Sequence, residues 1–334
     1  MDNKKNIMVF GATGLVGVYL VDDLIEHNYG VFAIGNKRLN DKYYSKRNIP
    51  HAQVDISDIN SFSNIEKVEN IDTVVILSAI MPASMEGYHP QKYFEINTIG
   101  TLNILEYCRK NGIKNVIYLQ SHSDLSGHWG EKDRISPYAT RKINYNNDHT
   151  VYVISKCAAM DLLEHYHQAY NFTYSVFRCP NIYAYYPKQY FYVDGKKTEI
   201  GYRKIINQAI NSETIEIWGE CKTAKDIVYV KDLTQMILKA IEVKPSNSVY
   251  NVSTGHSTTL EEQILGIIDV FSPESNKSKV VYRPEKKVHI NNHQYDISNA
   301  IEELNYCPQY DYITMLHDYK KEMQNDRFKE LLEN

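Results

Sequence analysis

The sequence predicts an α/β fold in which a doubly wound parallel sheet carries a smaller C-terminal α/β lobe. Three observations predict it. A glycine-rich turn at residues 11–17 separates an apolar run from a helix-like run at the start of the chain. Continuous apolar runs then alternate with helical patterns up to about residue 182, with crossovers long enough for parallel strands. Beyond residue 182 this alternation breaks into shorter aromatic and polar segments, which predict the second lobe.

The apolar pattern gives the expected elements in chain order. In the first part, strands are expected at 6–10, 31–34, just before 54, 71–77, 116–119 and 172–177, and helices at 15–28, 90–111 and 152–170. In the last third, helices are expected at 204–211, 233–243, 259–271 and 297–304, and strands at 215–219, 227–230, 249–252 and 279–283. The 249–252 strand should return to the main sheet. Asp232 should cap the helix expected at 233–243.

Composition excludes several classes of protein. The chain has 334 residues, 43% of them hydrophobic, and a formal net charge of −4, so it can bury a large core and lacks the basic surplus of a nucleic-acid binder. No apolar run approaches the roughly 20 residues that span a membrane, and the N-terminus leads straight into a strand without a signal peptide. The 5 cysteines form no C-x-x-C pair, and the histidines show no ligand spacing. We therefore expect a cytoplasmic protein with reduced thiols and no metal site.

The glycine-rich turn predicts a dinucleotide site. A strand, a glycine turn and a helix start bring backbone N–H groups to one point, which suits a pyrophosphate. The expected contacts are Gly11, Thr13, Gly14, Leu15, Val16 and Gly17. We assign residues 1–182, completed by segments near 226–254, to a dinucleotide-binding domain and residues 183–334 mainly to a substrate-binding lobe. A plain structural turn is the alternative.

The end of the second strand predicts which dinucleotide binds. An acidic residue there would bind the ribose hydroxyls of NAD, but the sequence reads Gly35-Asn36-Lys37-Arg38. The two cations would favour a 2′-phosphate by charge-assisted hydrogen bonds. The pattern favours NADP(H) over NAD(H), unless this is simply a solvated loop.

Other residues are expected to line the same crevice. Asp55, beside Ile56, can accept a hydrogen bond from the adenine amino group, while Ser57 or Asp58 caps the next helix. Leu77, Ser78 and Ala79 follow a buried strand and should pass close to the cofactor. Asn97 stands among apolar helix positions and needs a hydrogen-bond partner there, such as neighbouring backbone.

Tyr152 and Lys156 are the candidate catalytic pair. They lie four residues apart and therefore share one face of a helix. A lysine cation favours the phenolate, as does the positive ring of an oxidised nicotinamide, so the tyrosine could exchange a proton with a sugar hydroxyl or a carbonyl oxygen. Ser121, at the end of the neighbouring strand, could bind the same oxygen.

With these motifs in order, the chain resembles the extended short-chain dehydrogenase/reductases, in particular the nucleotide-sugar epimerases, dehydratases and reductases, over nearly its whole length. The markers are Gly11/Gly14/Gly17, Asp55-Ile56, Glu95-Ile-Asn97-x-x-Gly100-Thr101, Ser121, Tyr152/Lys156, Arg178-x-x-Asn181 and Asp226 to Asp232. The resemblance implies a Rossmann-type fold, hydride transfer usually at C4 of a sugar, and Tyr152 as acid/base. It also implies that Lys156 holds the nicotinamide ribose with support from Asn97, that Cys179 lies at the cofactor, and that Asn181, Lys225 and Arg283 contact the nucleotide diphosphate. A homodimer through the helices at 90–111 and 152–170 is implied as well.

The chain departs from the family pattern at several positions. His122 and Ser123 stand where sugar 4,6-dehydratases carry an Asp-Glu pair, which disfavours dehydration, and Ser123 rivals Ser121 for the serine role. Lys225 replaces the usual arginine and loses its bidentate geometry. These departures favour a 4-keto-sugar reductase using NADPH, or an epimerase, without separating the two. A non-catalytic dinucleotide sensor and a reductase of small non-nucleotide carbonyls are the alternatives.

Overall fold

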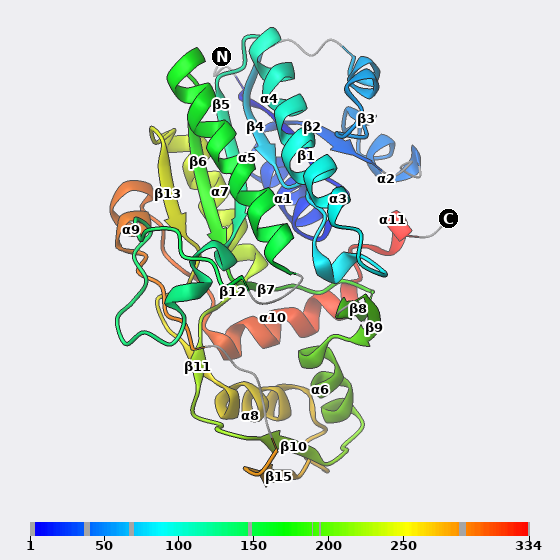
Figure 1. Ribbon diagram of the computed structural model, residues 1–334. Coiled ribbons are helices and arrows are strands. Elements are labelled where there is room, and N and C mark those ends of the chain that lie inside the picture. The colour runs from blue at the N-terminus through cyan, green and yellow to red at the C-terminus, as the bar shows by residue number, and fades with distance from the viewer. Residues whose placement is uncertain are drawn as a thin grey trace.

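Seven parallel strands form the main sheet of the protein, in the order β13-β6-β5-β4-β1-β2-β3. The computed structural model describes residues 4–36, 41–66, 70–145, 149–188, 190–193, 195–286 and 292–332. The strands are β1 (Asn6–Phe10), β2 (Gly30–Gly35), β3 (His51–Gln53), β4 (Ile71–Ile76), β5 (Asn115–Ser121), β6 (Thr173–Cys179) and β13 (Ser248–Asn251). The chain builds outwards from β1 to β3, returns to β4 and builds the other way (Figure 1). The predicted doubly wound, Rossmann-type sheet is confirmed.

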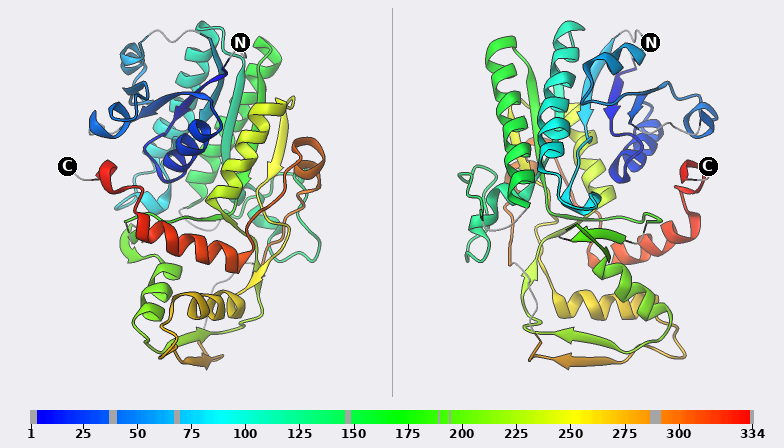
Figure 2. Two further views of the ribbon diagram at one scale, coloured as in Figure 1. Left: turned by 180° about the vertical axis from the view of Figure 1, so that it is seen from behind. Right: turned by 45° about the vertical axis from the view of Figure 1, so that its right-hand side comes forward.

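Helices cover both faces of this sheet. Helices α4 (Gly100–Lys110) and α5 (His149–Tyr170) lie on one face, and α1 (Leu15–Glu26) and α7 (Val230–Val243) on the other (Figures 1 and 2). Because side chains alternate along a strand, Ile7 and Val9 enter the core under α1 and α7, whereas Met8 and Phe10 enter the core under α4 and α5. Burial on both faces explains why these strands read as continuous apolar runs.

A smaller lobe of helices and short strand pairs lies below the carboxyl ends of the sheet strands (Figures 1 and 2). Its helices are α6 (Gly201–Ile210), α8 (Leu260–Phe271) and α10 (Tyr312–Asn325). Its strand pairs are β8 (Tyr190–Val193) with β9 (Lys196–Glu199), β10 (Ile215–Trp218) with β15 (Val280–Arg283), and β11 (Ala224–Lys225) with β14 (Thr258–Thr259). A further pair, β7 (Asn181–Tyr183) with β12 (Ile227–Tyr229), follows directly on β6. The remaining helices are α2 (Asp41–Ser45), α3 (Pro90–Tyr93), α9 (Ser298–Leu304) and α11 (Lys329–Leu332).

Two expected features differ in the structure. The helix expected at 90–111 is interrupted by a π-helical segment, Phe94–Ile99, between α3 and α4. Asp232 does not cap a helix: α7 begins earlier, at Val230, and the buried Asp232 carboxylate accepts hydrogen bonds from the backbone N–H groups of Gln309 (2.7 Å) and Tyr310 (3.2 Å). The capping expectation was wrong because the partners of this carboxylate come from a distant segment. Asp58, by contrast, caps the short 3-10 helix Ile59–Asn64.

A network of charged side chains joins the C-terminal segment to the main sheet domain. Arg327 donates to Asp22 on α1 (2.7 Å) and to Glu322 on α10 (2.6 Å), and its guanidinium lies 4.0 Å from the centre of the Tyr19 ring.

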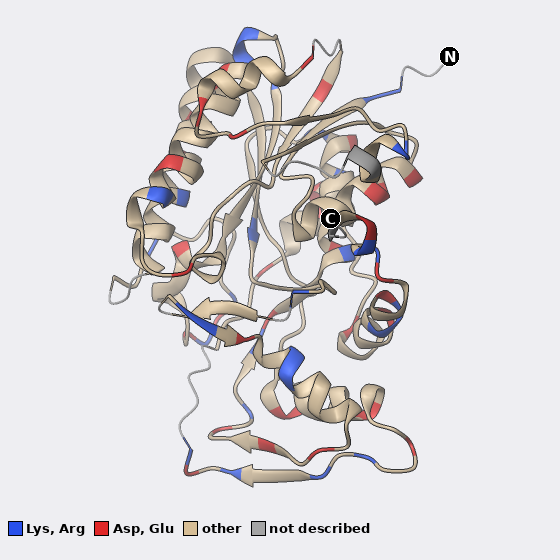
Figure 3. Cartoon of the chain, turned by 90° about the vertical axis from the view of Figure 1, so that its right-hand side faces the viewer, with Lys and Arg blue, Asp and Glu red and all other residues tan. Residues whose placement is uncertain are grey.

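Elsewhere, Figure 3 shows charges of both signs scattered over both lobes. Among the described residues, no helix is long and apolar enough to cross a membrane.

Candidate functional site

The glycine turn after β1 requires glycine at two of its positions. Gly11 has a φ of +89°, and a Cβ atom on it would lie 2.8 Å from the backbone nitrogen of Ser78. A Cβ atom on Gly17 would lie 2.1 Å from the carbonyl oxygen of Gly11, closer than any real contact. These two glycines therefore let α1 and the segment after β4 approach the turn closely.

The N-terminus of α1 fits an anionic ligand. Gly14 is its N-cap, and within the described residues no side chain caps it and no acidic residue stands in its first turn, which begins at Leu15 and includes Val16. The first N–H groups of a helix have no partner within the helix, and its dipole favours a negative charge there. Thr13 packs against Gly35 at the end of β2, where a Cβ atom would lie 2.8 Å from the Thr13 Oγ1. This arrangement suits the pyrophosphate of a dinucleotide.

The ends of β2 and β3 lie on one side of the glycine turn. Asn36 is exposed, and its carbonyl oxygen accepts a hydrogen bond from Gln53 Nε2 at 3.0 Å. Its two predicted neighbours in the cofactor site, Lys37 and Arg38, lie outside the described residues. The described end of β2 thus carries no carboxylate.

Asp55 and Ile56 follow β3. The exposed Asp55 carboxylate accepts hydrogen bonds from the backbone N–H (3.0 Å) and the hydroxyl (2.6 Å) of Ser57. Ile56 is buried against Gly100, where a Cβ atom would lie 2.6 Å from its Cγ1. The glycine in the Asn97-x-x-Gly100 motif therefore lets α4 approach the β3 end of the sheet.

Asn97 ties the segment after β4 to helix α5. Its Oδ1 accepts a hydrogen bond from the backbone N–H of Ile80 (2.8 Å), and its Nδ2 donates to the Ile80 carbonyl (3.0 Å) and the Ser155 hydroxyl (3.1 Å). Leu77, Ser78 and Ala79 precede Ile80 and are half-buried. Asn97 thus holds this segment next to the helix that carries the candidate catalytic pair, and it does so from the π-helical segment, a feature frequent at functional sites.

Replacing Asn97 with alanine should lower the free energy of unfolding by about 1–3 kcal/mol, because buried polar groups of Ile80 and Ser155 lose their partner. Urea denaturation measures this loss. The control is Asn111→Ala, which removes an exposed bond to the Tyr107 carbonyl and should change stability by less than about 0.5 kcal/mol. A loss no larger than that of the control would contradict this role of Asn97.

Ser121 and Tyr152 meet at the carboxyl edge of the sheet. Ser121 ends β5 in register with Cys179, which ends β6, and Tyr152 lies in the first turn of α5. Burial raises the pKa of the half-buried Tyr152, while a hydrogen bond with the Ser121 hydroxyl lowers it. Ser123 contributes its backbone N–H, which donates to the Ser121 Oγ at 3.2 Å. In this arrangement Ser121 is the serine that meets the phenol.

Lys156 is buried beneath Tyr152 on the same helix. Its Nζ donates to the carbonyl oxygen of Leu119 at 2.6 Å and lies 4.0 Å from the centre of the Tyr118 ring. Burial lowers the pKa of Lys156 to about 7, and burial raises the pKa of the neighbouring Cys179 thiol to about 12. The expected lowering of the Tyr152 pKa by a lysine cation is not what this structure shows, because burial of the phenol raises its pKa more than its hydrogen bond lowers it.

The predicted diphosphate contacts are not all in one place. Lys225 is half-buried in β11, and burial lowers its pKa. Asn181 is exposed at the start of β7, in register with Ile227 of the segment that carries Lys225. Arg283 lies at the end of β15, in the outer part of the lobe, and its Nε donates to Glu216 at 3.1 Å (Figure 1). The structure thus brings Asn181 near the strand after Lys225 and pairs Arg283 with a carboxylate.

Sequence reasoning missed a cluster of rings beside Ser121. His122 and Trp129, which follow β5, pack against His293 and Tyr295, which precede α9. The sequence shows His122 as a departure from the family pattern. Its contacts with His293 and Tyr295, about 170 residues away, cannot be predicted from the residues around it.

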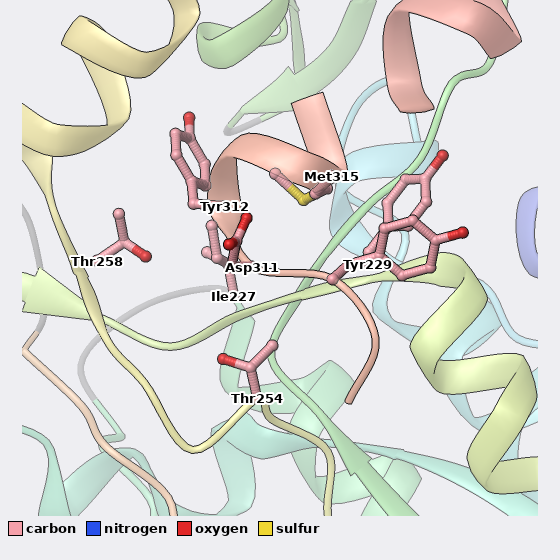
Figure 4. A pocket seen from close by; sticks show the side chains of 8 residues that line it. Ile227, Tyr229, Thr254, Thr258, Asp311, Tyr312 and Met315 are labelled. Carbon is pink, nitrogen blue, oxygen red and sulfur yellow. The ribbon is translucent and has the colours of Figure 1, made fainter. Parts of the chain in front are cut away.

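A small pocket lies elsewhere, between β12 and the start of α10 (Figure 4). It includes none of the predicted site residues, and its lining is Ile227, Tyr229, Thr254, Thr258, Tyr310, Asp311, Tyr312 and Met315. Within the described residues, no group of three or more His, Cys, Asp or Glu side chains could hold a metal ion.

Comparison with known proteins gives a consistent answer. The model of the NAD dependent epimerase/dehydratase family matches residues 7–253. A Methanocaldococcus jannaschii protein, provisionally assigned as a UDP-glucose 4-epimerase, is 27% identical over 91% of this chain and 94% of its own. The UDP-N-acetyl-alpha-D-glucosaminuronate decarboxylase of Bacillus cytotoxicus is 25% identical over 97% of this chain and 100% of its own. The crystal structure of UDP-glucose 4-epimerase from Thermotoga maritima, with UDP-glucose, matches with a TM-score of 0.75 and 25% identity, over 96% of this chain and 99% of that chain. The chain therefore belongs to the NAD-dependent epimerase/dehydratase family, within the extended short-chain dehydrogenase/reductases.

Proposed function

We propose that this enzyme transfers a hydride between a nicotinamide dinucleotide and C4 of a nucleotide-activated sugar, either reducing a 4-keto sugar or epimerising C4. One observation carries the proposal. The Tyr152 phenol is hydrogen-bonded to Ser121 and lies one helical turn from the buried Lys156, at the same edge of the sheet as the glycine turn. Ligands of open α/β sheets bind at this edge.

The residues of the chain have separate tasks in this chemistry. The bound dinucleotide supplies or accepts the hydride. Tyr152 exchanges a proton with the sugar oxygen, and the Ser121 hydroxyl holds the same oxygen in place. Lys156, fixed by the Leu119 carbonyl, lies where it can bind the nicotinamide ribose, and Asn97 holds the neighbouring segment.

The substrate is proposed from the family relatives and from two polar residues. The similar Thermotoga maritima epimerase was solved with UDP-glucose. The Lys225 ammonium could neutralise the negative charge of a diphosphate, and the Asn181 amide could donate a hydrogen bond to it, where residues 183–334, the proposed substrate-binding lobe, adjoin the sheet. A thermal-shift screen of UDP-, GDP-, CDP- and TDP-sugars, with NADPH and NAD added separately, tests this proposal. The screen could also show that none of these sugars raises the melting temperature and that free nucleotides raise it no more than buffer does. That result would favour a small non-nucleotide carbonyl as the substrate.

For the cofactor, we propose that NADP(H) is preferred over NAD(H), because Asn36 stands where a carboxylate would repel a 2′-phosphate. The variant Asn36→Asp should weaken NADPH binding about tenfold or more and strengthen NADH binding, since the new carboxylate repels the phosphate and accepts from the ribose hydroxyls. Isothermal titration with each dinucleotide measures both constants. Equal weakening of both, or a wild type that prefers NADH, would contradict the assignment.

We also propose a homodimer formed through α4, α5 and the π-helical segment between α3 and α4. Three apolar side chains of these elements, Phe94 (41%), Ile99 (45%) and Ile154 (38%), are exposed in the single chain. Exposed apolar residues of this size on adjacent helices suit burial against a second copy. The cytoplasmic location remains a prediction from cysteine usage.

A further inference from the structure

The ring cluster beside Ser121 holds an imidazole next to the proposed reaction site. His122 follows Ser121 directly in the chain, and its ring centre lies 5.0 Å from those of both Trp129 and His293 and 5.9 Å from that of Tyr295. These rings come from two segments, one after β5 and one before α9, so the cluster joins the end of β5 to the C-terminal part of the chain.

A chain of hydrogen bonds favours one tautomer of His122. The Trp129 indole N–H can only donate, and it donates to the Tyr295 hydroxyl at 3.2 Å. That hydroxyl keeps its own proton to donate, and the His122 Nδ1 lies 2.8 Å away as an acceptor for it. Nδ1 is then the acceptor of a neutral ring, and the ring proton sits on Nε2.

The surroundings keep this ring neutral. Burial, together with His293 and Lys225, holds the pKa of His122 well below its ordinary value. The segment that carries the partner rings is anchored to Asp226, which follows β11: the backbone N–H of Asp226 donates to the His293 carbonyl (3.0 Å), and that of Tyr295 donates to the Asp226 carboxylate (2.8 Å). The hydrogen-bond chain is thus built on a fixed backbone rather than on a free loop.

His122 has neighbours that we propose to bind the two ends of the substrate: Ser121 for the sugar and Lys225 for the diphosphate. On one side, its chain neighbour Ser121 is hydrogen-bonded to Tyr152. On the other side, Lys225 is close enough to depress its pKa and is paired through its backbone with His293. His122 therefore connects the Ser121–Tyr152 pair with His293, which pairs with the strand residue Lys225.

We propose that His122 contacts the substrate, offering its Nε2–H to an uncharged oxygen acceptor of the sugar next to the reacting carbon, with Trp129 and Tyr295 fixing the donor. This inference rests on the proposed function. A hydroxyl or amide carbonyl oxygen at that place fits the donor, whereas an ammonium group offers it no acceptor. His122 is then a specificity residue, and Tyr295 is a positioning residue that acts through it.

Calorimetric binding of UDP-glucose and of UDP to the holoenzyme tests this role. The variant His122→Phe should weaken UDP-glucose binding about tenfold and leave UDP binding within about twofold, because UDP lacks the sugar. His122→Gln, which keeps a donor, should recover part of the loss. The matched control is His317→Gln, an exposed histidine on α10, which should change neither constant.

Nitrogen-15 NMR of the imidazole supplies a readout that does not depend on the sugar. The wild type should show a neutral His122 ring with its proton on Nε2, and Tyr295→Phe should populate the other tautomer. A proton on Nδ1 in the wild type, or UDP-glucose binding by His122→Phe equal to wild type, would overturn the inference. Failure of the proposed function gives a different result, since the wild type would then be protected by none of the nucleotide sugars in the thermal-shift screen.

Discussion

Replacing Tyr152 with phenylalanine should lower kcat about 10²–10⁴-fold, the usual contribution of a positioned acid/base. The phenol is the titratable group bonded to Ser121 at the sheet edge, so the variant removes the proton carrier and leaves the ring packing against Tyr93. Steady-state kinetics on the nucleotide sugar found in the thermal-shift screen measure the effect.

The dinucleotide and sugar affinities of Tyr152→Phe should stay within about threefold of wild type, because a single hydrogen-bonding group contributes little to binding of so large a ligand. Ser123→Ala is the matched control in the same loop, since its side chain is not the one bonded to the phenol. Wild-type turnover by Tyr152→Phe would remove the proposed mechanism, and a loss of binding equal to the loss of kcat would assign Tyr152 to structure instead.

Replacing Gly17 with alanine should abolish dinucleotide binding and lower the free energy of unfolding by about 1–3 kcal/mol, the range for overpacking a close contact. The added Cβ would lie 2.1 Å from the Gly11 carbonyl and 2.7 Å from the Ala12 Cα, both rigid backbone atoms. Helix α1 must move away, which displaces its N-terminal N–H groups from the pyrophosphate. Isothermal titration and urea denaturation measure the two effects.

Gly201→Ala is the control for this substitution. Gly201 also lies in the first turn of a helix, α6, but a Cβ atom there meets nothing within 4 Å. Alanine should therefore stabilise the protein slightly, by up to about 1 kcal/mol, through the unfolded chain. Dinucleotide binding by Gly17→Ala at the wild-type level would show that the cofactor does not depend on this turn.

The sheet was predictable because its signals are local. Each parallel strand buries both faces and reads as a continuous apolar run, and the spacing of Gly11, Gly14 and Gly17 reports the strand-to-helix turn directly. The Tyr152–Lys156 spacing likewise fixes one helix face, and Ser121 falls at a strand end. These residues meet because the carboxyl ends of parallel strands share one edge.

The features that the sequence did not predict depend on contacts between residues far apart in the chain. Asp232 looks like a helix cap, yet its partners are backbone groups of residues 309 and 310. The π-helical segment around Asn97 and the imidazole chain of His122, Trp129 and Tyr295 also depend on contacts that no local pattern encodes. The lowered pKa of Lys156 depends on its burial, which the Tyr-x-x-x-Lys spacing leaves open.

Isotope tracing tests the central claim of hydride transfer most directly. The enzyme is mixed with UDP-glucose carrying deuterium at C4 and with NADP⁺ or NAD⁺, and the label is located by mass spectrometry and NMR. We predict deuterium on the nicotinamide ring, or an epimerised sugar that keeps its deuterium at C4 because the label returns from the dinucleotide. A product that carries solvent hydrogen at C4, or that forms without any dinucleotide, would contradict the account.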